Sequence, residues 1–216
     1  GKDKMLKIAK EFEEDIRITD KKNPLDFTLW RASSANQPVH IPSFDSPFGK
    51  GRPGWHIECS SMSTSTLGEQ IDIHGGGIDL IYPHHEAEIA QMESISGKKP
   101  LVNYWLHTGF LKINKSKMSK SLGNFKTIRD LLKICKPEVI RYFILLNHYR
   151  KPLDFTDDAL KNAENSYVRL KKICEEFKDD KKINKEYTEE FEKEMDDDFN
   201  TPNAMQVLWK FVRDKK

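Results

Sequence analysis

The sequence lacks the features by which several classes of protein are recognised. Its three cysteines, Cys59, Cys135 and Cys174, form an odd and scattered set, which excludes a disulfide framework. No apolar run is long enough to span a bilayer. The charged stretch over residues 1–15 has no apolar segment of the kind that signal peptides carry. We therefore expect a cytoplasmic protein that makes no contact with a membrane.

An excess of charge of one sign is also missing. The 36 lysines and arginines nearly balance the 34 aspartates and glutamates, leaving a net charge of +2. No global basic field points to a nucleic-acid partner, so any such contact must be local. Charged residues make up 32% of the chain and hydrophobic residues 37%, which is more polar than an average domain. The 216 residues can still bury a core in one or two domains.

Strand and helix signals alternate in the middle of the chain. This order is typical of parallel strands joined by crossover helices, and it predicts an α/β fold. The expected elements are a short helix over 23–33, a structured loop over 39–54, a strand end leading into a helix over 55–68, a strand over 70–77, a helix over 83–97 and one or two strands over 101–113.

From residue 127 onward the apolar positions follow a helical period. They predict two helices broken near Pro137, and then a helix with Thr156 as its N-cap and acidic residues in its first turn. The charged stretch 178–190 is expected to be a linker or a solvated hairpin. Two more helices, joined at 200–202, complete a helical C-terminal region.

Three residues could bind a metal ion. His84 and Glu88 are four residues apart on a predicted helix and therefore share a face, which makes half of a zinc site. Cys59 lies near a predicted strand-to-helix junction, where the functional groups of open α/β sheets gather. The alternative is a solvated helix face, with Cys59 as a small buried apolar residue.

The stretch HGGGIDL over residues 74–80 combines glycines with an acidic residue. Three glycines after a short strand allow a ligand to approach the backbone closely. Asp79 could then accept hydrogen bonds from a ribose, as acidic residues do in nucleotide sites. A tight turn explains the glycines equally well.

The stretch KSKMSKSLGNF over residues 115–125 holds three lysines and three serines. Lysine is a compact point charge that suits phosphate. A mobile loop could bring that charge to the reacting phosphates as the transition state forms. An ordinary solvated loop has the same composition.

The string KMSKS over 117–121 is the second signature of class I aminoacyl-tRNA synthetases, and further stretches match in order. Together they closely resemble the second half of cysteinyl-tRNA synthetases, over roughly residues 18–210. The stretches that carry the resemblance are GRPGWHIECS (51–60), DIHGGGIDLIYPHHEAEIAQ (72–91), NYWLHTGFL (103–111), KMSKSLGNF (117–125), RYFILLNHYR (141–150) and MDDDFNTPNA (195–204).

The resemblance implies a fold and an activity. The expected fold is the second half of a Rossmann-like class I catalytic domain with a parallel sheet, followed by α-helical stem-contact and helical-bundle regions. The family activates L-cysteine with ATP to cysteinyl-adenylate and transfers the acyl group to tRNA(Cys). One zinc ion per active site binds the substrate thiolate and separates cysteine from serine, since zinc prefers the softer ligand. Mg²⁺ is expected with ATP, and the protein is expected to be a monomer.

The resemblance also implies roles for individual residues. The zinc ligands correspond to Cys59, His84 and Glu88, and Trp55 corresponds to a residue that lines the cysteine pocket. The lysines expected at the ATP phosphates are Lys120 and, assisting it, Lys117. The adenylate-binding stretch corresponds to His74, Gly75, Gly76, Gly77 and Asp79, together with Lys120. His85 and Glu86 correspond to neighbours of the metal site, and for Trp55 a place in the core remains open.

Two features of the family are not found in the sequence. They are the first class signature, a His-x-Gly-His motif, and the cysteine before it that supplies the fourth zinc ligand. We therefore interpret the chain as an internal part of a longer protein, and we expect it alone neither to fold stably nor to activate cysteine. The expected segments are the end of a connective insertion with a linker (1–38), the second half of the catalytic domain (39–116), the KMSKS loop with stem-contact helices (117–152) and the start of a helical domain (153–216).

Two other functions fit the same residues. The cysteine ligase of the mycothiol pathway has a similar catalytic core and joins cysteine to a sugar amine. The long charged helical region after residue 150 fits a tRNA-contacting domain better. The second alternative is a non-catalytic derivative that binds zinc or tRNA, which the intact KMSKS string argues against.

Overall fold

The computed structural model describes residues 21–23, 25–118, 123–177 and 182–214. The chain forms two compact units, Gly1–His107 and Thr108–Lys216, and each is described by itself. The four segments expected from the sequence remain a prediction.

The first unit begins with a hairpin-like pair of short strands. Strand β1 (Trp30–Ala32) pairs antiparallel with β2 (Gly51–Pro53). The chain between them has little regular structure, which confirms the predicted loop over 39–54 except at its end, where residues 51–53 form β2. The predicted helix over 23–33 is wrong. Residues Asn23 and Asp26 form a turn, and residues 30–32 bond to a strand that is remote in sequence. Such tertiary pairing overrides a local helical pattern.

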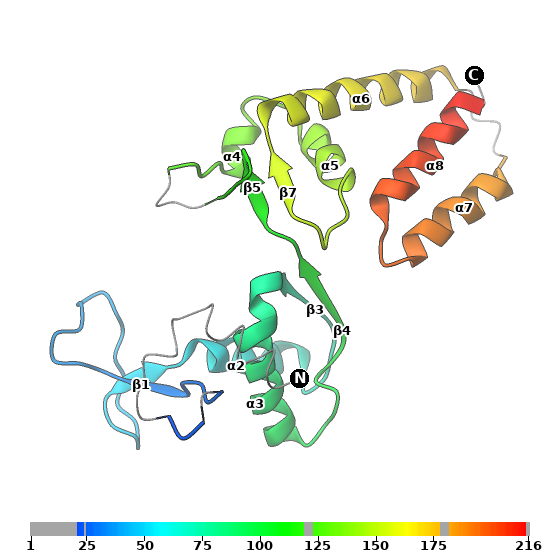
Figure 1. The fold of residues 1–216 in the computed structure, drawn as a ribbon. Coiled ribbons are helices and arrows are strands. Elements are labelled where there is room, and N and C mark those ends of the chain that lie inside the picture. Colours follow the sequence, from blue (N-terminus) through cyan, green and yellow to red (C-terminus); the bar gives the residue numbers. More distant parts are fainter. Residues whose placement is uncertain (1–20, 24, 119–122, 178–181, 215–216) are drawn as a thin grey trace. The chain divides into compact units, whose positions relative to one another are not determined.

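Two helices accompany the next two strands (Figure 1). Helix α2 (Trp55–Leu67) follows β2 directly, so the predicted strand end at Trp55 is wrong. The extended residue Gly54 separates strand from helix. Strand β3 (Ile71–Gly77) lies beside β4 (Val102–Thr108). The 3-10 helix η1 (Ile78–Leu80), the π-helical segment η2 (Ile81–His85) and helix α3 (Glu86–Ser96) connect them. A small core packs between these elements, formed by Ile71, Met92, Leu101 and Val102.

The second unit has three short strands in the order β6-β5-β7. Strand β5 (Leu111–Ile113) pairs antiparallel with β6 (Ser116–Lys117) and parallel with β7 (Leu153–Phe155). The sequence did not indicate β7. It has three residues with Asp154 at its centre, so no alternation of apolar and polar residues marks it.

Apart from these strands, the regular structure in the described part of the second unit is helical, as predicted. They are α4 (Ile128–Leu131), α5 (Pro137–Leu145), α6 (Asp157–Glu176), α7 (Lys185–Asp196) and α8 (Thr201–Asp214). Pro137 opens α5, and the Thr156 hydroxyl caps α6 by accepting a hydrogen bond from the Ala159 N–H at 3.0 Å. Helix α7 begins inside the stretch that was expected to be a linker, where Asn184 supplies its N-cap.

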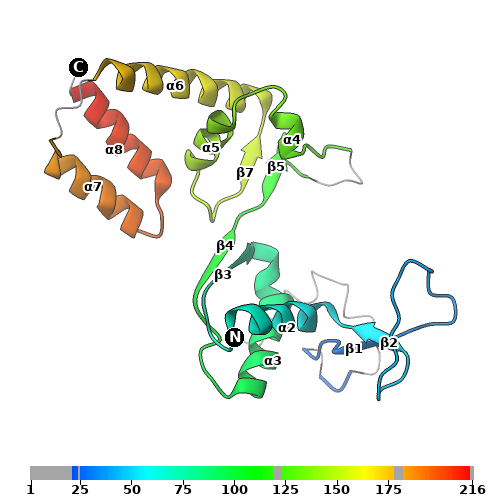
Figure 2. The same ribbon diagram turned by 180° about the vertical axis from the view of Figure 1, so that it is seen from behind.

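Helices α7 and α8 lie side by side in both Figure 1 and Figure 2. The Trp209 indole N–H on α8 donates to the Tyr142 hydroxyl on α5 at 2.9 Å, which ties the pair to the core of the unit. None of the helices among the described residues is long and apolar enough to cross a membrane.

Candidate metal centre

The structure brings together the three residues proposed as metal ligands. Cys59 lies on α2, His84 on η2 and Glu88 on α3. Helices α2 and α3 contact each other. One donor atom from each residue lies within 4.8 Å of the others. Sulfur, imidazole nitrogen and carboxylate oxygen are the ligands that zinc accepts. Their role as ligands remains a prediction.

The carboxylate of Glu88 is buried and poorly hydrogen-bonded. Its side chain is 2% exposed, yet neither carboxylate oxygen makes a hydrogen bond of ordinary geometry with the described residues. The nearest nitrogens are Nε2 of His84, 3.3 Å from Oε1, and Nε2 of His74, 3.4 Å from Oε2. A buried carboxylate with only these long contacts is costly, and a bound cation would offset that cost.

The Glu88 side chain also carries the charge that a metal ligand needs. Burial raises the pKa of its carboxyl, but the imidazoles of His84, His74 and His85 together bring that pKa below its ordinary value. The group is therefore ionised at neutral pH. Burial, followed by the carboxylates of Glu88 and Glu58, raises the pKa of the Cys59 thiol. Binding of a divalent cation would release that thiol's proton.

Two histidine pairs surround the candidate ligands. The Nδ1 atoms of His84 and His56 lie 2.8 Å apart, and so do Nδ1 of His85 and Nε2 of His107. Because Nδ1 of His84 faces Nδ1 of His56, Nε2 of His84 is directed to the carboxylate and the donor cluster. Burial lowers the pKa of His85 to about 4, so this ring is neutral at physiological pH.

Tryptophan side chains flank the histidines. Trp55 stacks on His84 with ring centroids 4.4 Å apart, and it is 55% exposed, which excludes a place in the core. Trp105 lies against His85, with ring centroids 4.8 Å apart. Trp55 thus forms a partly open aromatic wall beside a candidate ligand. Its contact with substrate remains a prediction.

The glycine stretch passes close behind the histidines. A Cβ on Gly76 would lie 2.8 Å from Cε1 of His85, so any other residue here would force that ring to shift. A Cβ on Gly75 would meet only the Leu106 carbonyl at 3.7 Å, which is ordinary contact. His74, expected at the adenylate, also faces Glu88 and forms a second possible ligand group with His85 and Glu88. Asp79 is half-buried in η1.

The lysines of the KMSKS string belong to the second unit. Lys117 ends strand β6, and Lys120 lies outside the described residues. Met118 packs against the core of that unit. Gly123 has a φ of 64°, the left-handed conformation that suits a turn after the string.

Sequence reasoning missed several members of the centre. His56, His107 and Trp105 were not singled out, nor was the Ser60 hydroxyl, which donates to Gln91 Oε1 at 2.6 Å. Histidine usage was the available signal. Of seven histidines in the chain, only His40 and His148 lie outside the cluster.

Comparison with known proteins defines the class first. The family model described as the class I (C) tRNA synthetase catalytic domain matches residues 2–165, and the DALR domain model matches residues 190–214. The chain therefore belongs to the class I tRNA synthetase (C) catalytic domain family. This confirms the resemblance on which the expected fold and ligase class were based.

Relatives within this class are named cysteine–tRNA ligases. A cysteine–tRNA ligase of Legionella pneumophila (strain Corby) is 50% identical over 200 residues, which cover 91% of this chain and 43% of the relative. A cysteine–tRNA ligase of Thermodesulfovibrio yellowstonii is 50% identical over 210 residues, covering 90% and 42%. The chain thus spans less than half the length of these relatives.

A solved structure confirms the fold. The agnB2 LeuRS of Agrobacterium radiobacter K84, in a ternary complex with tRNA and LeuAMS, matches 79% of this chain with a TM-score of 0.56. The match covers 29% of that chain at 13% identity, so the likeness concerns the fold alone.

Proposed function

We propose that the protein containing this chain is a cysteine–tRNA ligase. It would join L-cysteine to ATP, forming cysteinyl-adenylate and pyrophosphate, and then transfer the cysteinyl group to tRNA(Cys). The observation that carries the proposal is the cluster of Cys59, His84 and Glu88 beside a half-exposed Trp55. The names of relatives at 50% identity agree with it. We further propose that the protein is cytoplasmic and monomeric. Sedimentation of the purified protein would test the monomeric state.

The donor set fits zinc, held by Cys59, His84 and Glu88. The fit rests on the two buried Glu88 oxygens without hydrogen bonds and on the mixture of sulfur, nitrogen and oxygen donors. When bound, zinc would supply a soft Lewis acid that prefers the thiolate of cysteine to the hydroxyl of serine.

The residues of the chain would prepare this selection. Glu88 is held ionised by the surrounding imidazoles, and His56 orients the His84 ring. The stacked Trp55 would cover one side of the amino-acid pocket and exclude water from it. Pocket shape alone separates near-isosteric side chains poorly, so the chemical difference between sulfur and oxygen has to be recognised directly.

The nucleotide would be bound by a different set of residues. Asp79 would accept hydrogen bonds from the ribose, next to a glycine backbone over 75–77 that allows close approach. Lys120, assisted by Lys117, would stabilise the charge that develops on the phosphates, with Mg²⁺ as the partner of ATP.

Cysteine-dependent exchange between ATP and pyrophosphate tests the proposal in the full-length protein. We expect exchange with cysteine and none with serine, and we expect a chelator to abolish it. Charging of tRNA(Cys), compared with transfer to a sugar amine, would then separate the tRNA ligase from the mycothiol-type ligase. A folded, zinc-loaded protein without exchange would leave the non-catalytic binding module as the better reading.

A further inference from the structure

The connection between α7 and α8 has an unusual backbone. Asp198 and Phe199 are consecutive, neither is glycine, and both have a φ of 54°. Left-handed conformations are strained for residues with a Cβ, and for a bulky residue such as phenylalanine they are rare. Strain of this kind persists where the surrounding structure requires one geometry.

The surrounding structure is the turn that follows α5. The Tyr149 hydroxyl donates to Asp198 Oδ1 at 2.6 Å. The Arg150 guanidinium donates to both oxygens of the same carboxylate, through Nη2 to Oδ1 at 3.1 Å and through Nε to Oδ2. His148 Nε2 lies 3.9 Å from Oδ2, and the Tyr149 ring meets Phe199 edge to face. The Asp198 carboxylate thus binds two neighbouring side chains that are 48 and 49 residues away.

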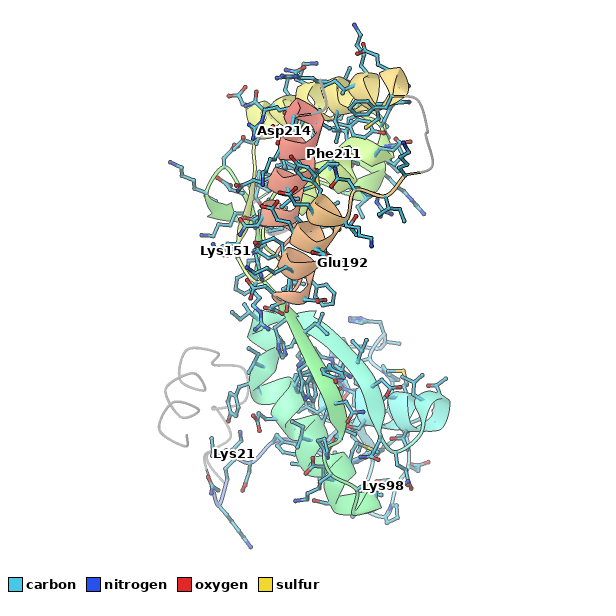
Figure 3. The ribbon with its side chains drawn as sticks, turned by 90° about the vertical axis from the view of Figure 1, so that its right-hand side faces the viewer. Lys21, Lys98, Lys151, Glu192, Phe211 and Asp214 are labelled. Carbon is cyan, nitrogen blue, oxygen red and sulfur yellow. The ribbon has the colours of Figure 1, made fainter. Side chains whose placement is uncertain are left out.

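The turn over 147–151 is itself tightly hydrogen-bonded. The Asn147 side-chain amide donates to the carbonyls of His148 and Lys151, at 3.2 and 3.1 Å. The Lys151 N–H donates to the His148 carbonyl at 2.9 Å. Lys151 is labelled in Figure 3. The turn and the α7–α8 connection lie at the same end of the unit in Figures 1 and 2. A rigid turn transmits a displacement of Asp198 instead of absorbing it.

The same turn holds the chain that leads into β5. The Gly109 N–H donates to the Tyr149 carbonyl at 2.7 Å. A Cβ on Gly109 would overlap the backbone of Lys151 and lie 2.7 Å from Pro152 N, so the two segments are in direct backbone contact. The Leu153 N–H then donates to the Phe110 carbonyl at 3.0 Å, where β7 begins to pair with β5.

Strand β5 leads directly to the KMSKS string. Asp154 on β7 accepts from the Lys115 N–H at 2.7 Å, in the tight turn between β5 and β6. The Asn114 N–H donates to the Phe155 carbonyl at 3.2 Å. Both residues of this turn, Asn114 and Lys115, have positive φ angles, and Lys117 follows two residues later. Hydrogen bonds therefore link Asp198 to the start of the lysine loop without a gap.

We propose that Asp198 is a positioning residue, which couples the α7–α8 helix pair to β5 and β6, the strands from which the KMSKS string continues. The inference rests on the proposed function, because the loop's role at ATP belongs to it. The carboxylate touches no reacting atom. It holds the 147–151 turn, the turn holds β5, and β5 and β7 set the base of the loop. A ligand that shifted α7 and α8, such as a bound tRNA, would therefore displace the strands that lead into the KMSKS string.

The test compares two aspartates in the full-length protein. Asp198→Asn removes the charge and keeps the shape. Asp196→Asn is the matched control, since Asp196 ends α7 and its carboxylate makes no hydrogen bond or ion pair within the described residues. Because Asp198 is 40% exposed, its substitution should leave the protein folded.

Two readouts separate positioning from a structural role. In cysteine-dependent pyrophosphate exchange, we expect Asp198→Asn to raise KM for ATP or lower kcat by about threefold to tenfold, with KM for cysteine unchanged. In deuterium exchange followed by mass spectrometry, backbone amides over 109–118 should exchange about threefold to tenfold faster. The Asp196→Asn protein should match the wild type in both.

A second variant guards against a folding defect. Tyr149→Phe deletes one hydroxyl, and it should reproduce part of the effect. The double variant should be no worse than Asp198→Asn, because both changes break the same contact. Unchanged deuterium exchange in Asp198→Asn and Tyr149→Phe would overturn the coupling. The coupling would also be overturned if the kinetic constants for ATP and for cysteine worsened equally, in proportion to the fall in melting temperature.

Failure of the proposed function would look different. The wild-type protein would then show no exchange with cysteine, while the deuterium comparison between Asp198→Asn and Asp196→Asn would still decide whether the helix pair and the loop are coupled.

Discussion

The two units of the chain each hold one informative carboxylate, and the two carboxylates differ in almost every respect. Glu88 is 2% exposed and has no hydrogen bond of ordinary geometry within the described residues. Asp198 is 40% exposed and accepts hydrogen bonds from Tyr149 and Arg150. A buried carboxylate with only long imidazole contacts suits a cation, whereas a half-exposed carboxylate hydrogen-bonded to a guanidinium and a hydroxyl holds two segments together.

The electrostatic surroundings explain the contrast. The imidazoles of His84 and His74 face Glu88, and an imidazole can offer a lone pair to a metal as well as a proton to a carboxylate. Asp198 faces a guanidinium, which has donors only and cannot ligate a cation. This contrast is the basis for proposing a metal site at Glu88 and a positioning contact at Asp198.

The largest expected effect comes from removing the Glu88 charge. In Glu88→Gln, zinc content and cysteine-dependent exchange should both fall by at least ~100-fold, since changes in the groups behind the ligands alone cost about 10- to 100-fold. Zinc analysis of the purified protein and the exchange assay measure the two losses. Glu86→Gln, an exposed neighbour, is the control and should bind zinc normally. Full zinc content in Glu88→Gln would refute its role as a ligand.

The next largest effect is a loss of stability from filling the tight contact between Gly76 and the His85 ring. In Gly76→Ala, the new Cβ would press on the His85 ring, and the free energy of unfolding should fall by about 1–3 kcal/mol. Gly75→Ala is a matched control in the same stretch, because its Cβ has room. Thermal or denaturant unfolding distinguishes them. Equal stability of the two variants would show that the packing against His85 is looser than the structure indicates.

The partner of His84 should have a smaller effect. His56→Ala leaves the three candidate ligands in place but removes the group that orients His84, so zinc affinity should fall about tenfold. Competition with a metal indicator measures the affinity. His40→Ala, outside the cluster and exposed, should leave it unchanged. An unchanged affinity in His56→Ala would mean that α2 orients the site through Cys59 alone.

The smallest effect concerns pH and Asp198. The Arg150 guanidinium and the Tyr149 hydroxyl, with His148 nearby, hold the pKa of the Asp198 carboxyl below its usual range. A lowered folded-state pKa adds stability above the unfolded value of about 3.9, and that stability is lost as pH falls through the folded-state pKa. The melting temperatures of wild type and Asp198→Asn should differ slightly at pH 7 and converge in acid. If the difference persisted in strong acid, the ionised carboxylate would not be its cause.

Local signals predicted much of the fold. Thr156 and Pro137 mark helix starts because capping and proline geometry depend on neighbouring residues only. The helical period brought His84 and Glu88 onto one face, and the structure places their side chains 3.3 Å apart. Two predictions failed where the structure depends on residues far away in the sequence: a helix was expected over 23–33, and strand β7 was not expected. Both segments form strands only because a remote strand offers hydrogen bonds.

The sequence by itself determined the class of the protein, through ordered motifs, and the identity of three candidate ligands. Only the tertiary structure decided which histidines stand behind them, because His56 and His107 lie 28 and 22 residues from the rings they contact. It alone also joined Asp198 to Arg150 across 48 residues. Helical spacing is a property of the local chain, whereas burial and contact between distant segments exist only once the chain has folded.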